Sequence, residues 1–102
     1  MKFMTMSIFP VSKAADISAA QEKLVREYPS EGRPATGFLM MSVPFDVPPN
    51  SMVTVSIGES DSAEDMAARV YPLILAGADM SVIPLLELPI GGMVEAEKKY
   101  RS

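Results

Sequence analysis

The sequence predicts one α+β domain of the ferredoxin-like type, with a four-stranded antiparallel sheet that carries two helices on one face. The chain has 102 residues, which is enough for one domain and too few for two. Its apolar fraction of 48% is sufficient for a packed core. Segments with a period of two alternate with segments of helical period in the order β-α-β-β-α-β. Two β-α-β units with right-handed crossovers produce this sheet. We therefore treat residues 1–102 as one domain, with residues 90–102 as a helical tail.

The first β-α unit is expected over residues 2–28. Apolar and polar residues alternate over residues 2–9, as in a strand, and Pro10 ends the pattern. Ser12 is placed to cap a helix over residues 13–28. The apolar residues of this helix recur at helical spacing and are Ile17, Ala20, Leu24 and Tyr28.

Two further strands are expected over residues 36–43 and 52–58, with a proline-rich loop between them that is too long for a tight hairpin. Strand 52–58 carries β-branched residues at alternate positions, which is typical of a buried strand face. A turn-rich connector joins the first helix to the earlier of these strands.

The second helix is expected to begin at Asp61 or Ser62, because acidic residues follow at capping-box spacing. Pro72 is expected to kink or split this helix, and Gly77 to end it. A fourth strand is expected over residues 80–88, where Pro84 indicates an edge strand or a bulge. The tail helix follows the glycine pair at residues 91–92.

One face of such a sheet lies under helices and the other is bare. We expect the uniformly apolar positions to lie under the helices: Met4, Met6, Ile8, Leu39, Met41, Val43, Val53, Val55 and Ile57. The bare face would then carry phenylalanines, methionines and hydroxyls: Phe3, Thr5, Ser7, Phe9, Phe38, Met40, Ser42, Met52, Thr54 and Ser56. We expect Ile83, Leu85 and Glu87 to share that face. A solvated face would carry charges, so a second copy is expected to cover this one as a homodimer. Two alternatives are that the faces are exchanged and that the tail helix covers the sheet within one subunit.

Composition excludes several classes of function. The net charge is −4, and the basic residues are scattered, which argues against nucleic-acid and anionic-membrane partners. The apolar runs are shorter than the ~20 residues of a membrane span, so we expect a soluble, cytoplasmic protein. The chain lacks cysteine, histidine and tryptophan, and with them thiolate chemistry, the usual neutral-pH base and the commonest metal ligand. We expect no metal and no cofactor, and we interpret the acidic residues near Asp61 as helix-capping groups.

The chain resembles short, uncharacterised members of the dimeric α+β barrel superfamily, related to antibiotic-biosynthesis monooxygenase-like and stress-responsive barrel domains. Three segments carry the resemblance, which spans residues 2–90: the first strand at residues 2–8, the acidic helix start at residues 61–65, and the turn and strand at residues 77–85. The resemblance implies a dimer with an apolar pocket, either between each sheet and its own helices or inside the barrel. It transfers no catalytic residue, because this chain has no His, no Trp and a single Asn, Asn50.

Two functions follow. The first is a homodimeric small-molecule-binding or assembly domain with an apolar pocket on the sheet face. Its candidate ligand-binding residues are Thr5, Ser7, Phe38, Met40 and Ser56. The second is a cofactor-independent enzyme of monooxygenase or isomerase type, with Glu87 as its base, because a carboxylate enclosed among apolar groups has a raised pKa. A buried, convergent polar group in a closed pocket would favour the enzyme.

Overall fold

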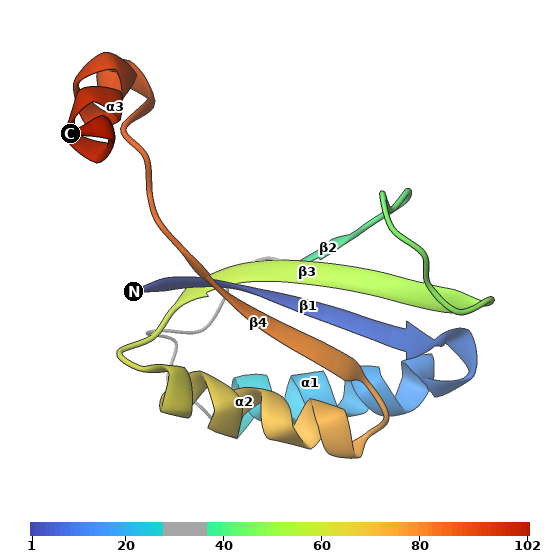
Figure 1. Ribbon diagram of the computed structural model, residues 1–102. Coiled ribbons are helices and arrows are strands. Elements are labelled where there is room, and N and C mark those ends of the chain that lie inside the picture. Colours follow the sequence, from blue (N-terminus) through green and yellow to red (C-terminus); the bar gives the residue numbers. More distant parts are fainter. Residues whose placement is uncertain (28–36) are drawn as a thin grey trace.

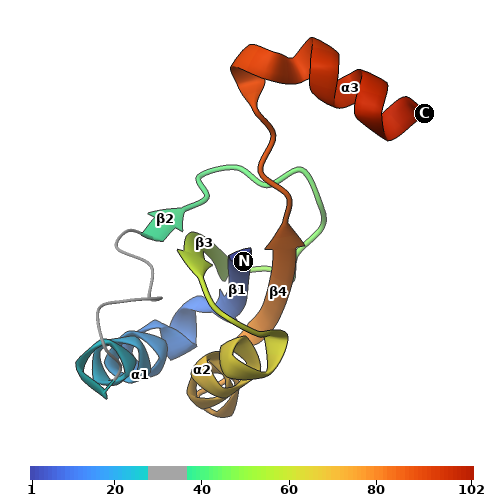
Figure 2. The ribbon, with the colours of Figure 1, turned by 90° about the vertical axis from the view of Figure 1, so that its left-hand side faces the viewer.

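A computed structural model describes residues 1–27 and 37–102 and confirms the predicted fold class. The elements in chain order are β1 (Lys2–Pro10), the 3₁₀ turn η1 (Val11–Lys13), α1 (Ala14–Glu27), β2 (Gly37–Leu39), β3 (Ser51–Glu59), α2 (Ala63–Leu75), β4 (Asp79–Leu85), the 3₁₀ turn η2 (Ile90–Gly92) and α3 (Met93–Arg101). The sheet has the order β2-β3-β1-β4, and each neighbouring pair is antiparallel. Helices α1 and α2 cover one face, and α3 stands away on the opposite side (Figures 1 and 2).

The first β-α unit follows the sequence pattern closely. Strand β1 extends one residue beyond the predicted end, and η1, which contains Ser12, precedes α1. The predicted apolar stripe of α1 faces the sheet, since Ile17 and Leu24 are buried and Ala20 is half-buried against the core. Tyr28, the last residue of the predicted stripe, lies outside the described residues.

Helix α2 is capped at both ends by the chain itself. Ser62, one of the two residues expected to begin this helix, is the N-cap residue, and its Oγ accepts a hydrogen bond of 3.0 Å from the backbone N–H of Asp65. The helix runs through Pro72 without splitting, contrary to one of the two expectations. Gly77 has a φ of 112°, and the backbone N–H groups of Gly77 and Ala78 donate to the carbonyls of Ile74 and Leu73. This Schellman arrangement ends the helix and needs a residue that tolerates the left-handed region.

Two strands are shorter than predicted. Strand β2 ends at Leu39, and after Met40 donates its N–H to the Val53 carbonyl the chain leaves the sheet in the proline-rich loop. Thr36, the predicted first residue of this strand, lies outside the described residues. Strand β4 is an edge strand, as Pro84 indicated, but it ends at Leu85. Glu87 therefore does not lie on a strand.

The assignment of the sheet faces from the sequence is wrong for the two central strands. Phe9 packs in the core with Ile17 and Leu24 of α1 and Leu73 of α2. In the register of β1 with β3, Phe9 lies opposite Met52, and each such pair shares a face. The helix-covered face therefore carries the residues that we expected on the bare face: Phe3, Thr5, Ser7, Phe9, Met52, Thr54 and Ser56.

The opposite, uncovered face carries most of the uniformly apolar positions. They are Met4, Met6, Ile8, Val53, Val55 and Ile57, joined by Phe38, Ile83 and Leu85. The sequence pattern led to the wrong assignment because we assumed that the more apolar face of β1 and β3 would pack against the chain's own helices. The helices instead cover phenylalanines at the ends of β1 and hydroxyls at its centre. For β1 and β3 the two faces are therefore exchanged relative to the expectation, which was one of the two alternatives.

The uncovered face keeps large apolar side chains in contact with solvent. Phe38 is 57% exposed and Ile57 is 51% exposed. Helix α3 rises on this side of the sheet at the end of an extended segment and does not lie over the sheet (Figure 1). The second alternative, a tail helix folded over its own sheet, is therefore wrong.

We predict that Phe9→Ala lowers the free energy of unfolding by about 3–5 kcal/mol, because it removes a buried aromatic ring from beneath both helices. The matched control is Phe45→Ala in the loop before β3, where the ring is 39% exposed and the expected loss is about 1 kcal/mol or less. Urea denaturation of the two variants measures both values. Equal losses would contradict the face assignment.

Candidate functional site

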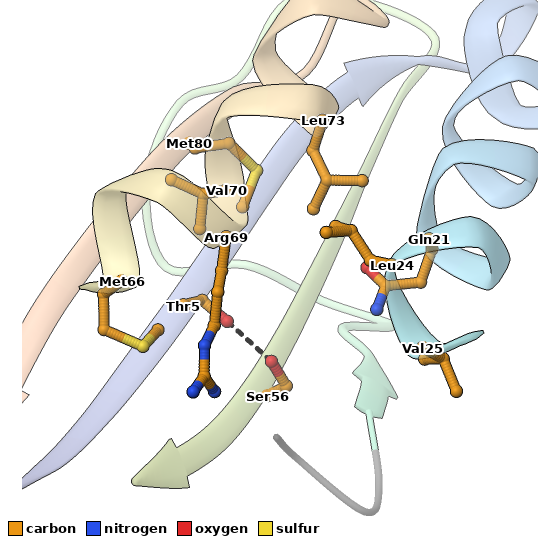
Figure 3. Close-up of a pocket in the computed structure, with 10 residues that line it drawn as sticks. All are labelled: Thr5, Gln21, Leu24, Val25, Ser56, Met66, Arg69, Val70, Leu73 and Met80. Carbon is orange, nitrogen blue, oxygen red and sulfur yellow. Dashed lines mark hydrogen bonds between the residues drawn. The ribbon is translucent and has the colours of Figure 1, made fainter. Parts of the chain in front are cut away.

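A pocket lies between the sheet and the two helices that cover it. Its inner lobe has a volume of about 70 Å³ and its outer lobe about 560 Å³. Both lobes are lined by Thr5 and Ser56 from the sheet, Gln21 and Val25 from α1, Leu73 from α2 and Met80 from β4. Because the two lobes share these six residues, they form one continuous site. Figure 3 shows the inner lobe, with the α1 residues on one side and the α2 residues on the other.

Hydroxyl groups form the sheet side of this pocket. Thr5 lies directly opposite Ser56 in the register of β1 and β3, and Thr5 Oγ1 and Ser56 Oγ share a hydrogen bond of 2.6 Å (Figure 3). Ser7 and Thr54 form the next cross-strand pair on the same face and line the outer lobe. The pocket thus combines a short row of hydroxyls on the sheet with helix walls that carry both apolar and polar side chains.

Ser7 is the least satisfied group of this row. Its side chain is buried, with 7% exposure, and its Oγ has no hydrogen-bond partner among the described residues. Burying a hydroxyl without a partner costs about 1–3 kcal/mol. Such a buried and unpartnered group is unusual in a folded protein.

Arg69 is the only charged side chain among the described residues that line the inner lobe. It projects from α2, and its side chain is 17% exposed. Arg69 Nη2 donates to Asp65 Oδ2 at 2.9 Å, one helical turn earlier. Asp65 Oδ2 also accepts a hydrogen bond of 2.5 Å from Ser60 Oγ. The carboxylate therefore holds the guanidinium at the edge of the pocket.

The structure brings together four of the five ligand-binding candidates. Thr5, Ser7 and Ser56 line the pocket from the sheet, and Phe38 borders the outer lobe from the edge strand β2. Met40 is not among the described lining residues. The hydroxyls face the chain's own helices, whereas the sequence placed them on the bare face.

Glu87 does not meet the requirement for a base in an enclosed pocket. It follows β4 and is 75% exposed, and its Oε1 accepts a hydrogen bond of 2.5 Å from Lys2 Nζ. This hydrogen bond and the charge of Lys2 lower the pKa of Glu87, and they raise the pKa of Lys2 in return. The expected rise in the pKa of Glu87 is therefore wrong for the single chain, because the carboxylate lies in solvent beside a cation.

Sequence reasoning missed the helix residues of the pocket, above all Gln21 and Arg69. Gln21 lies one helical turn after Ile17, next to the apolar stripe of α1. Arg69 immediately precedes the buried Val70. The signal in the sequence was that both polar residues border the apolar stripe of a helix. It could not be used, because the wrong assignment of the sheet faces placed no pocket between the sheet and the helices.

Asp65, one of the acidic residues at the start of α2, has a structural role. Within residues 1–27 and 37–102, no group of three or more acidic residues is arranged to hold a metal ion. Asp65 pairs with Arg69, and Ser62 caps the helix. None of the described helices is long and apolar enough to cross a membrane.

A scan against models of protein families finds no match, and a search of curated proteins finds none either. Among solved structures, the chain is similar to SnoaB, a cofactor-independent oxygenase from Streptomyces nogalater. The two chains are 11% identical, the match covers 85% of this chain and 95% of SnoaB, and the TM-score is 0.46. At this identity the similarity concerns the arrangement of helices and strands, which the sheet topology of this chain establishes by itself.

Proposed function

We propose that this chain is a homodimeric domain that binds a small, mostly apolar molecule between its sheet and its helices. The observation that carries the binding proposal is the row of hydroxyls from Thr5, Ser7, Thr54 and Ser56 on the sheet side of a pocket that also has apolar walls. Ligand sites are typically concave and apolar with a few convergent polar groups, and they have volumes of roughly 300–1,000 Å³. The outer lobe, at about 560 Å³, lies within this range.

Binding without chemistry is the function that these residues support. An acid–base enzyme needs a group near the reacting atoms that can take up a proton. Glu87 lies outside the pocket, paired with Lys2. Glu22, the one carboxylate among the described lining residues, lies on the exposed surface of α1 at the outer lobe.

The dimer is the second part of the proposal. The uncovered sheet face presents Phe38, Ile57 and Ile83 to solvent beside other apolar residues. Contiguous apolar surfaces of this kind mark interaction sites in soluble proteins. Helix α3 rises on the same side, and a nine-residue helix is too short to be stable in water without a packing partner. A second copy, related by a two-fold axis, would cover both surfaces.

The binding proposal is tested with the neutral fluorescent probe N-phenylnaphthylamine. Gln21→Trp places a large ring where it borders both lobes, so we expect the dissociation constant to rise by about tenfold or more. Ala19→Trp is the matched control, because Ala19 is exposed on the same helix and does not line either lobe; its affinity should stay within about twofold. Fluorescence titration measures all three proteins. Absence of probe binding to the unmodified chain, or equal losses in both variants, would refute the proposal.

The dimer is tested by Phe38→Asp, which would bury an unpaired charge in the interface at a cost of several kcal/mol. We expect light scattering to report a dimer for the unmodified chain and a monomer for this variant. Val11→Asp, at an exposed position in η1 away from the uncovered face, should leave the dimer intact. A monomer for the unmodified chain at micromolar concentration would contradict the proposal.

A further inference from the structure

The pocket is asymmetric in charge. Arg69 lines the inner lobe, and no carboxylate is among the described residues that line this lobe. At the outer lobe, Glu22 is the charged residue among the described ones that line it. A ligand in the pocket therefore meets positive charge at one end and negative charge at the other.

The position of Arg69 is fixed by a short relay of side chains. Ser62 Oγ holds the backbone of Asp65 at the start of α2, and Ser60 Oγ holds its carboxylate. The same carboxylate oxygen accepts from Arg69 Nη2. Since each of these groups is tied to the N-terminal turn of α2, the guanidinium is oriented before any ligand arrives, which lowers the entropic cost of binding.

Hydroxyl groups of the sheet line the same lobe as this cation. Figure 3 shows the guanidinium end of Arg69 on the same side of the inner lobe as the Thr5–Ser56 hydroxyl pair. A guanidinium next to hydroxyl donors is a combination that recognises oxygen anions, because charge-assisted hydrogen bonds are stronger than neutral ones. The remaining walls, from Leu24, Val70, Leu73 and Met80, suit an apolar body.

We infer that the ligand is an apolar molecule with an anionic oxygen head group, such as a carboxylate or sulfonate, and that Arg69 selects for this group. This inference rests on the proposed binding function and specifies its ligand class. Arg69 contacts the head group, with the hydroxyls of Thr5 and Ser56 beside it, and the apolar body extends toward Ser7 and the outer lobe. Asp65 acts through Arg69 as a positioning residue.

Two fluorescent probes with the same ring framework test the inference: neutral N-phenylnaphthylamine and anionic anilinonaphthalenesulfonate. We expect the unmodified chain to bind the anionic probe about tenfold more tightly. Arg69→Gln should abolish this preference while changing the affinity for the neutral probe by about twofold or less. Arg26→Gln is the matched control, because it removes the same charge from an exposed position on α1 outside the pocket and should retain the preference.

The outcomes separate the two proposals. If neither probe binds, the binding function itself fails. If the neutral probe binds and the anionic probe binds no better, or if the preference survives Arg69→Gln, the pocket stands and the anionic ligand class is refuted. Circular dichroism melts of each variant check that Arg69→Gln remains folded, and Arg69→Lys, which keeps the charge but not the planar fork, should retain part of the preference.

Discussion

The register of β1 between β3 and β4 is the constraint on which the rest of the structure depends. Strand β1 is central and pairs along most of its length with both neighbours. Because the side chains of a strand alternate, a slip of one residue would exchange every side chain between the two faces. The observed register places Phe3 and Phe9 under the helices and puts Thr5 opposite Ser56, where their hydroxyls pair. The core and the candidate pocket are thus set by the same pairing.

This arrangement reverses the usual polarity of a sheet covered on one side, in which apolar residues face the helices and polar residues face water. Here the helix-covered face contains hydroxyls at its centre, and the uncovered face carries a group of apolar residues on its central strands. A sequence pays a stability cost when it buries an unpartnered hydroxyl such as that of Ser7. The proposed ligand on the helix-covered face and the proposed second copy on the uncovered face would together account for both departures. Local rules fail at sites of function, where other demands compete with stability.

The sequence was sufficient for the element order, for the Ser62 cap and Gly77 end of α2, and for the edge position of β4, because each depends on local chemistry. It was also sufficient to group Thr5, Ser7 and Ser56 on one face of the sheet, since side chains at alternate strand positions share a face. The sequence was not sufficient to decide which face of the sheet the helices cover. Periodicity fixes which residues share a face, but the tertiary contacts of Phe9 with α1 and α2 decide which side that is. The prediction for Glu87 was wrong for a related reason. The end of β4 is set by its pairing with β1, and the first residue of β1, Lys2, lies opposite Leu85.

The central claim is that a small apolar molecule binds on the helix side of the sheet, and methionine methyl groups provide direct reporters of the two sides. Met66 and Met80 line the pocket, whereas Met4 and Met6 lie on the uncovered face. Nuclear Overhauser effects between bound N-phenylnaphthylamine and methyl-labelled methionines distinguish these positions in a single spectrum. The account predicts contacts from the probe to the methyl groups of Met66 and Met80. Contacts to Met4 and Met6 in their place would contradict it.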